Sequence, residues 1–168
     1  LVLPDEDSEY NMYMLCAEKM KDKGYFHYEI SNFAKIDCEC QHNLGYWQEK
    51  RYYGFGPSAS GFVSNTRYDN VATLQDYLKT PTENLLVNSK EISLEEQANE
   101  FAMLGLRLAK GLSLEQFKAN YNSDFFQFFP NATDLLNDGF LQVVGEKVLV
   151  PKEKFYVVNS ILCELLNI

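Results

Sequence analysis

The residues best suited to chemistry lie in one short stretch, His42-Asn43-Leu44-Gly45-Tyr46-Trp47. It holds one of the two histidines of the chain and its only tryptophan. An imidazole nitrogen can coordinate iron, and aromatic rings can stack on a large planar ligand. His42 is therefore a candidate metal ligand. The alternative is a histidine that is only hydrogen-bonded within a loop.

A second candidate is the glycine-rich segment Gly54-Phe55-Gly56-Pro57-Ser58-Ala59, which begins seven residues beyond Trp47. Glycines let a backbone approach a bound cofactor closely. The segment lacks the full Gly-x-Gly-x-x-Gly pattern and the preceding strand and following helix of a dinucleotide-binding loop. As an isolated phosphate-binding motif it is weak.

The four cysteines are Cys16, Cys38, Cys40 and Cys163. Cys38 and Cys40 lie close to His42, which suggests a Cys/Cys/His metal site. However, the Cys-x-Cys spacing is poor for zinc and no fourth ligand is evident. Since no secretion signal precedes them, we expect free thiols rather than disulfides.

Composition limits the class of protein. The 168 residues are 46% hydrophobic and 14% aromatic, which supports a packed core. The net charge of −9 argues against nonspecific nucleic-acid binding. No apolar run approaches the roughly 20 residues of a membrane-spanning helix, and the first residues are acidic rather than signal-like. We expect a cytoplasmic protein.

The first half of the chain predicts a mixed α/β arrangement. Apolar residues at helical spacing and a terminal Gly24 predict a helix over 8–23, and a β-rich run predicts a strand over 25–33. Residues 35–66 show weak periodicity and no clean helix. A short helix over 71–78 capped by Asn70 is expected, followed by a linker or crossing loop over 80–90.

The second half predicts helices and one hairpin. Two capping boxes, beginning at Ser93 and Ser113, mark the starts of helices over 94–109 and 114–121, the first of them ended by Gly111. A third helix ends near 138–139, strands follow over 140–144 and 147–150, and a helix over 152–166 closes the chain. This order suggests a winged-helix module. Residues 89–168 carry seven basic and eleven acidic side chains, a net charge of −4, so we expect no nucleic-acid partner.

Several of these segments, in this order, carry a family resemblance. They are Tyr28-Glu29-Ile30-Ser31-Asn32-Phe33-Ala34, the His42–Trp47 stretch, the Gly54–Ala59 segment, and Thr66-Arg67-Tyr68-Asp69-Asn70 with its spacing to Tyr77. The chain resembles the C-terminal part of HemW-like radical SAM haem chaperones, within the oxygen-independent coproporphyrinogen III oxidase-like family. The resemblance implies an α/β + α fold. Residues 1–80 would end an open (β/α)₆ radical SAM barrel, 81–89 would be a linker, and 90–168 a winged-helix-like C-terminal domain.

The resemblance also implies site residues. Haem contacts would come from His42, Asn43, Tyr46, Trp47 and Arg67, with His42 as the candidate iron ligand. S-adenosyl-L-methionine (SAM) would lie near Gly54, Gly56, Ser58, Ala59 and Ser60, although Pro57 and Ser60 depart from the family pattern.

Structural alternatives stand beside these roles. Asn43 would fix a loop through Asx-type hydrogen bonds, Tyr46 and Trp47 would be core residues, and Arg67 would pair with Asp69. Glu29 and Asn32 would either bond to SAM or another ligand or form a buried pair.

The resemblance further implies that the parent protein uses a [4Fe–4S] cluster, SAM and haem, and delivers haem to acceptor proteins. The cluster-binding Cys-x-x-x-Cys-x-x-Cys loop is not in this sequence. We therefore expect a fragment that is inactive by itself and whose exposed barrel edge favours weak self-association. The alternatives are a true coproporphyrinogen III oxidase, which decarboxylates propionates, and a winged-helix interaction module.

Overall fold

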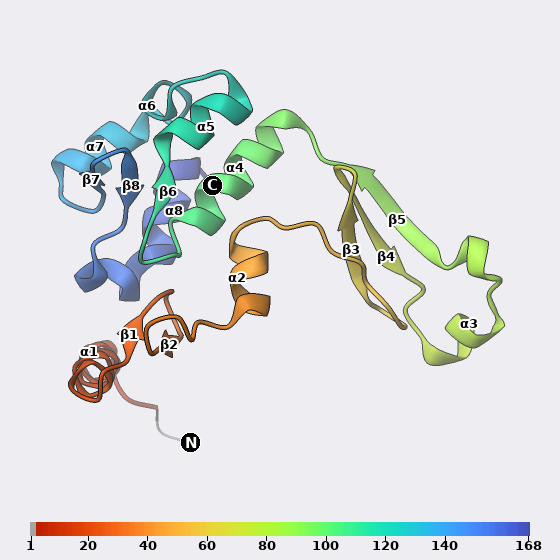
Figure 1. Ribbon diagram of the computed structural model, residues 1–168, viewed down its shortest axis with the longest axis horizontal. Helices are drawn as coiled ribbons and strands as arrows, with labels where there is room; N and C mark the ends of the chain where they lie inside the picture. Colours follow the sequence, from red (N-terminus) through yellow and green to blue (C-terminus); the bar gives the residue numbers. More distant parts are fainter. Residues whose placement is uncertain (1–2) are drawn as a thin grey trace. The chain divides into compact units, whose positions relative to one another are not determined.

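The computed structural model describes residues 3–168, which form two compact units (Figure 1). The first unit contains the residues up to Gln48 together with Ala98–Ile168, and the second contains Glu49–Gln97. Each unit combines helices with antiparallel strands, so the predicted mixed α/β content is confirmed. Within residues 3–168, no helix is both long and apolar enough to cross a membrane.

The first unit opens with helix α1, Glu6–Asp22, close to the predicted helix over 8–23. The Asp5 carboxylate caps it by accepting from the Ser8 N–H at 2.8 Å. Acidic residues occupy its first turn and lysines its last, as the helix dipole favours. Gly24 follows with φ of 76°, a conformation that glycine adopts without strain.

The prediction of one continuous strand over 25–33 is wrong. Two short strands, β1 (Phe26–His27) and β2 (Phe33–Ala34), pair antiparallel as a hairpin. The turn between them is stabilised by local hydrogen bonds. The Tyr28 N–H donates to the Asn32 carbonyl, and the Ser31 N–H donates to the Glu29 carboxylate at 3.2 Å. A polar side chain that bonds its own backbone favours a turn over a strand.

The second unit is built on a three-stranded antiparallel sheet, β3-β4-β5 (Figure 1). Ser64 and Asn65 form the β3–β4 turn with positive φ, the backbone that tight hairpins require. A 3₁₀ turn and helix α3 lie between β4 and β5, and Thr73 caps α3, not the predicted Asn70. The bounds are β3 Ser60–Val63, β4 Thr66–Asn70, α3 Leu74–Lys79, η1 Thr82–Asn84 and β5 Leu86–Glu91.

Residues 80–90 are therefore not only a linker, because they contain η1 and most of β5. Its six residues, Leu-Val-Asn-Ser-Lys-Glu, are mostly polar and mostly exposed, so the sequence carries no alternating apolar signal. The segment becomes a strand because it pairs with β4. The register of this pairing is irregular between Arg67 and Asp69. The expectation of a weakly structured 35–66 segment is also wrong, since it contains helix α2 (Gln41–Trp47) and strand β3.

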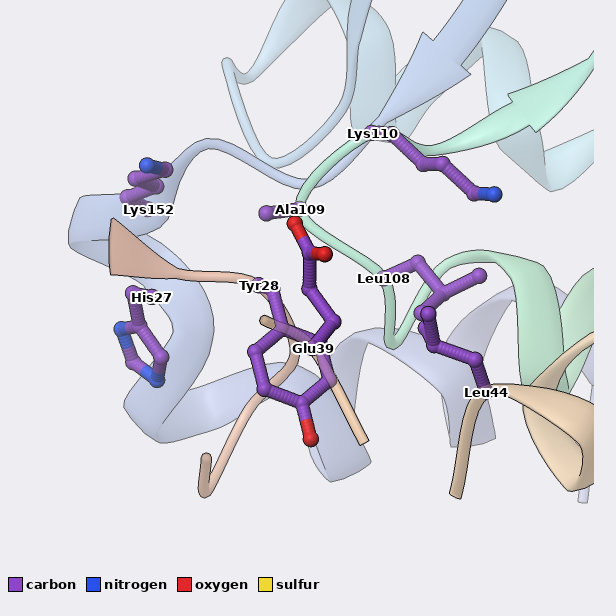
Figure 2. Close-up of a pocket in the computed structure, with 8 residues that line it drawn as sticks. All are labelled: His27, Tyr28, Glu39, Leu44, Leu108, Ala109, Lys110 and Lys152. Carbon is purple, nitrogen blue, oxygen red and sulfur yellow. The ribbon is translucent and has the colours of Figure 1, made fainter. Parts of the chain in front are cut away.

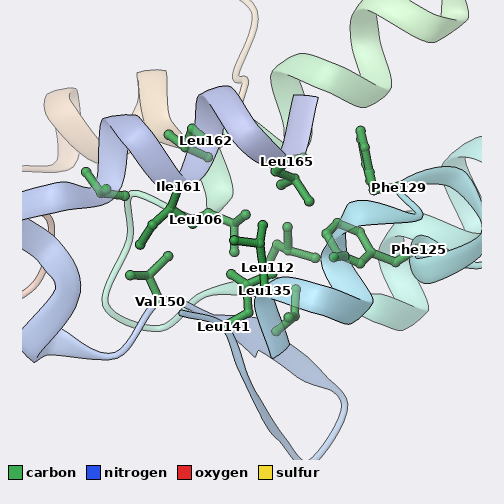
Figure 3. Close-up of a cluster of buried hydrophobic side chains, with 14 of the residues drawn as sticks. Leu106, Leu112, Phe125, Phe129, Leu135, Leu141, Val150, Ile161, Leu162 and Leu165 are labelled. Carbon is green, nitrogen blue, oxygen red and sulfur yellow. The ribbon is translucent and has the colours of Figure 1, made fainter. Parts of the chain in front are cut away.

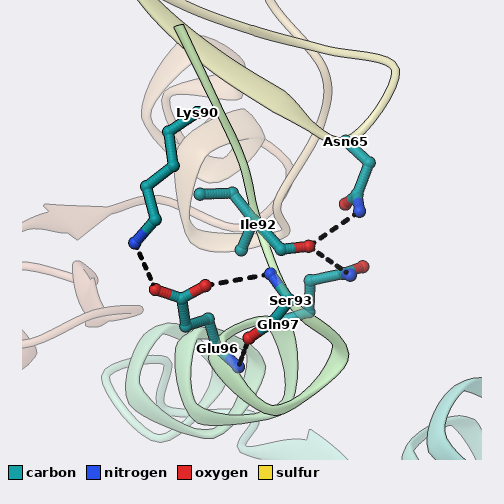
Figure 4. Close-up of polar contacts among 6 residues, drawn as sticks. All are labelled: Asn65, Lys90, Ile92, Ser93, Glu96 and Gln97. Atoms are coloured by element: carbon teal, nitrogen blue, oxygen red, sulfur yellow. Dashed lines mark hydrogen bonds and ion pairs between the residues drawn. The ribbon is translucent and has the colours of Figure 1, made fainter. Parts of the chain in front are cut away.

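The first predicted capping box is confirmed (Figure 4). At the start of helix α4, Leu94–Gly105, the Ser93 hydroxyl accepts from the Glu96 N–H, and the Glu96 carboxylate accepts from the Ser93 N–H. Lys90 forms an ion pair with the same carboxylate. These hydrogen bonds, with Lys90 as the strongest contributor, lower the pKa of Glu96 to about 2. The helix start is thus fixed by side chains from the segment before it.

Helix α4 ends at Gly105, four residues before the predicted end. Gly105 packs so closely on Leu112 that a Cβ would lie only 2.8 Å from the Leu112 Cβ. The chain then leaves the helix, and the Ala109 N–H donates to the Tyr28 carbonyl in the hairpin turn. Tertiary contacts therefore end the helix before Gly111 does.

The rest of the first unit packs short helices against a small antiparallel sheet with strand order β6-β8-β7. The predicted helix over 114–121 and the predicted hairpin at Gly145-Glu146 are confirmed. The final helix is a 3₁₀ turn followed by an α-helix. The bounds are β6 Leu112–Ser113, α5 Leu114–Tyr121, α6 Phe125–Phe128, α7 Asn131–Asn137, β7 Gln142–Val144, β8 Lys147–Leu149, η2 Lys152–Val157 and α8 Val158–Leu166.

These elements enclose one hydrophobic core (Figure 3). Leucines, isoleucine and valine from α8, β8 and the segments around them meet an aromatic cluster from α5 and α6. Phe117 is fully buried at the centre of that cluster. Its ring lies within 6.0 Å, between centroids, of five other rings: Phe101, Tyr121, Phe125, Phe128 and Phe129. This core holds the C-terminal part of the first unit together.

Candidate functional site

The His42–Trp47 stretch forms helix α2 rather than a loop. His42 and Tyr46 stand one turn apart and share one face of this helix. Both are exposed, and their rings meet edge to face with centroids 5.0 Å apart. An exposed imidazole held beside an aromatic edge is available to a ligand from solution.

Asn43 and Trp47 lie on another side of α2, where both contact the protein. The Asn43 amide donates to the Tyr28 hydroxyl at 3.4 Å, and the Trp47 ring lies under the Arg107 guanidinium at 6.0 Å. The Asx-type loop predicted for Asn43 is wrong, because Asn43 is helical and bonds the hairpin instead. The structural alternative for Trp47 agrees with these contacts, whereas Tyr46 is 42% exposed and is not a core residue.

A pocket of about 450 Å³ lies beside α2 (Figure 2). Leu44 of α2 reaches it from one side, and the turn after α4 forms another wall. In the close-up, the Tyr28 ring and the Glu39 side chain stand near the middle, and the Lys110 side chain extends away from them. His42 is not part of the lining, which is His27, Tyr28, Glu39, Leu44, Leu108, Ala109, Lys110 and Lys152.

His27, which the sequence reasoning did not single out, is buried at the edge of this pocket. Its ring stacks on Phe33 at 4.2 Å and meets Phe155 edge to face at 5.2 Å. The Tyr13 hydroxyl donates to the Ile30 carbonyl at 2.9 Å, which leaves its oxygen to accept from His27 Nε2 at 3.4 Å. Burial, and to a smaller extent the Glu29 carboxylate, raises the pKa of Tyr13 to about 12. This network joins α1, the hairpin and η2.

The burial of His27 predicts a pH dependence of stability. Desolvation and the nearby Lys152 lower the pKa of His27, although the backbone of Ile30 and the Glu29 carboxylate oppose the shift. A histidine whose pKa is lower in the folded state binds more protons when unfolded. Its contribution is therefore fully present above the ordinary pKa of 6.5 and is lost as the pH falls below it. We expect the free energy of unfolding to decline over that acidic range.

Urea unfolding at a series of pH values measures this effect. His27→Phe keeps an aromatic ring against Phe33 but cannot take up a proton. The variant is expected to flatten the decline of stability just below pH 6.5. An equal slope in the wild type and the variant would contradict the assignment to His27.

The glycine-rich segment belongs to the second unit, where its own protein contacts explain its glycines. A Cβ on Gly54 would collide with the Ser60 carbonyl, and Gly56 has φ of 99°. The buried Asn70 amide donates to the carbonyls of both glycines, at 3.1 and 2.9 Å. The sequence predicts Asn70 as a helix cap, whereas its side chain lies at the centre of this loop, a role that no local pattern indicates.

The other members of the segment are also bonded within the second unit. The Ser58 hydroxyl donates to the Ala72 carbonyl at 2.7 Å, and the Ser60 hydroxyl to the Asp69 carboxylate at 2.6 Å, while Ala59 donates its N–H to Gly56. These contacts shape the loop without a cofactor.

Arg67 is an exposed residue of β4 whose guanidinium lies over the Phe62 ring at 5.1 Å. Asp69, its predicted partner, accepts from Ser60 and from the Asn88 amide at 3.4 Å. Arg67 and the glycine-rich segment belong to the second unit, whereas the four motif residues His42, Asn43, Tyr46 and Trp47 share the first.

The cysteines do not form a metal site. All four thiols are free and exposed. Within residues 3–168, no three His, Cys, Asp or Glu side chains gather to hold a metal ion. The thiolates present therefore do not fit a [4Fe–4S] cluster, which needs three of them together. Glu29, by contrast, is buried and accepts from the Ser31 N–H, but Asn32 is exposed, so the buried pair of Glu29 and Asn32 that was the structural alternative is wrong.

Comparison with known proteins places these features in a family context. Residues 92–153 match the HemN C-terminal domain. The chain is 32% identical to the haem chaperone HemW of Lactococcus lactis over 96% of its length, and 37% identical to HemW of Bacillus subtilis over 84%. It spans 43% and 38% of those two relatives.

A solved structure shares the fold. Coproporphyrinogen III oxidase (HemN) from Escherichia coli, described as a radical SAM enzyme, aligns with a TM-score of 0.74 at 16% identity. The alignment covers 97% of this chain and 42% of the oxidase. The resemblance predicted from the sequence is thus confirmed: the chain is similar over nearly its whole length to part of the HemW haem chaperones, and it carries a match to the HemN C-terminal domain.

Proposed function

We propose that this chain is the C-terminal part of a HemW-type haem chaperone and that α2 presents haem on its exposed face. The observation that carries the proposal is the exposed His42–Tyr46 pair on a helix whose other side is bound by the protein. An exposed imidazole can coordinate haem iron, and a neighbouring aromatic ring can contact the porphyrin. Asn43 and Trp47 would contribute by fixing the helix.

The comparisons favour a chaperone over an oxidase. The relatives at 32% and 37% identity are both named haem chaperones, whereas the oxidase shares only the fold at 16% identity. The parent protein would use a [4Fe–4S] cluster and SAM, pass haem to acceptor proteins and work in the cytoplasm. The thiols described here do not fit the cluster, so we assign it no ligand in this chain.

We further propose that residues 1–80 end an open radical SAM barrel, that 81–89, which contain η1 and most of β5, lead out of it, and that 90–168 form a winged-helix-like domain. The α5–α7 helices followed by the β7–β8 hairpin support the last assignment. The roles of Arg67 as a propionate partner, of the Gly54–Ser60 segment near SAM and of weak self-association remain predictions. A winged-helix interaction module alone would not account for the exposed His42.

Haem titration of the protein, followed by Soret absorbance, tests the proposal. His42→Ala is expected to shift the Soret band and to weaken haem binding about tenfold or more, which corresponds to about 1.4 kcal/mol. Cys40→Ser is the matched control, because Cys40 is an exposed thiol two residues away that could also bind iron. Unchanged affinity and spectrum in His42→Ala would exclude His42 as the ligand.

A further inference from the structure

Helix α2 carries few local signals that would keep it folded. It has seven residues and contains Gly45. Cys40 precedes it without a side-chain capping bond. Its first turn has no acidic residue, and its last turn has no basic residue. A helix this short is marginal in water, and an internal glycine weakens it further. Its position must therefore depend on tertiary contacts.

One of these contacts is made by Trp47 at the end of α2. Its indole N–H is buried and has no hydrogen-bond partner among residues 3–168. The ring is therefore not held by a hydrogen bond of its own, and packing must fix it. The Arg107 guanidinium lies over its face at 6.0 Å, in the range of a cation–π interaction.

Arg107 is itself fixed from two other elements of the first unit. Its Nη1 donates to the Met103 carbonyl in α4 at 3.1 Å, and its Nη2 donates to Asn159 Oδ1 in α8 at 2.9 Å. Within the described residues it has no acidic partner, although the side chain is partly buried. Burial lowers the pKa of the guanidinium. The nearby Cys163 opposes that shift, and the electron-rich Trp47 face also favours the charge.

We infer that Arg107 is a positioning residue for haem binding, which fixes Trp47 and thereby the α2 face that carries His42 and Tyr46. This role rests on the proposed function. Arg107 lies within residues 92–153, which match the HemN C-terminal domain, so this region would have a role in haem binding. That region would hold the haem-presenting helix in place without touching the haem.

Trp47 is the only tryptophan, so its fluorescence reports on this contact directly. Arg107→Gln removes the charge, and Arg107→Lys keeps a cation over the ring. Without haem, Arg107→Gln is expected to shift the emission to longer wavelength and to increase quenching by acrylamide. The haem affinity of Arg107→Gln is expected to fall about threefold to tenfold relative to the wild type. Arg107→Lys should recover part of the emission shift and part of the lost affinity. Lys154→Gln, which removes a cation over Phe140 at 5.0 Å, is the matched control and should change neither.

Unchanged emission in Arg107→Gln overturns the inference, and so does a shifted emission with unchanged haem affinity. If the wild type binds no haem, the proposed function fails, whereas the haem-free emission still reports whether Arg107 anchors α2. Circular dichroism shows whether Arg107→Gln remains folded. If it does not, Asn159→Ala removes one Arg107 hydrogen bond and should produce a smaller emission shift in the same direction.

Discussion

Replacing Phe117 with alanine is expected to lower the free energy of unfolding by about 3–5 kcal/mol. Phe117 is fully buried, and its ring contacts five aromatic neighbours from α4, α5, α6 and the residue after α6. Truncation would remove both the buried ring and these ring–ring contacts, and it would leave a cavity that the surrounding helices cannot close fully. Urea unfolding followed by circular dichroism measures the loss.

Phe55→Ala is the matched control for this substitution. Phe55 is 85% exposed, so the same chemical change should alter the free energy of unfolding by less than about 0.5 kcal/mol. A loss below about 1 kcal/mol in Phe117→Ala would show that the aromatic cluster is not tightly packed.

The second large effect is expected at Gly111, in the turn before β6. Gly111 has φ of 66°, and a Cβ would collide with the Val148 carbonyl oxygen and approach the Leu149 Cβ at 2.7 Å. The left-handed backbone costs an alanine about 1–2 kcal/mol, and the collision adds about 1–3 kcal/mol of overpacking. The obstructing atoms belong to strand β8, so no flexible side-chain end can move aside.

Gly145→Ala separates the two contributions. Gly145 has φ of 59°, and within the described chain no heavy atom beyond its two neighbours lies within 4 Å of the position that a Cβ would take. It should therefore carry the backbone cost alone. The difference in thermal unfolding midpoints between Gly111→Ala and Gly145→Ala then measures the collision with β8. Equal midpoints would contradict the close approach at Gly111.

Local signals made much of the fold predictable from the sequence. The serines at positions 93 and 113 cap α4 and α5 as expected, because an N-cap needs only atoms within the next turn. The Gly145-Glu146 turn that joins β7 to β8 was also predictable, because a tight turn involves only neighbouring residues. These features depend on neighbours in the chain, so reading the sequence in short windows is sufficient to find them.

Other elements were not predictable because distant residues form them. Strand β5 is mostly polar and becomes a strand through pairing with β4. Helix α4 ends at Gly105, and the segment after it bonds the hairpin turn, where the Ala109 N–H donates to the Tyr28 carbonyl. His27 and Arg107 carry no sequence signature, and their importance comes only from the side chains that surround them.

The sequence by itself determined the family resemblance, the helix starts and the candidate motif from His42 to Trp47. Only the tertiary structure decided which side chains of that motif contact the protein and which are exposed. Once α2 is helical, residues four apart share a side, and the contacts of Tyr28 and Arg107 select Asn43 and Trp47 as the bound side. His42 and Tyr46 are left exposed because no distant segment packs over them to the same extent. That division depends on partners far away in the chain, which no local pattern specifies.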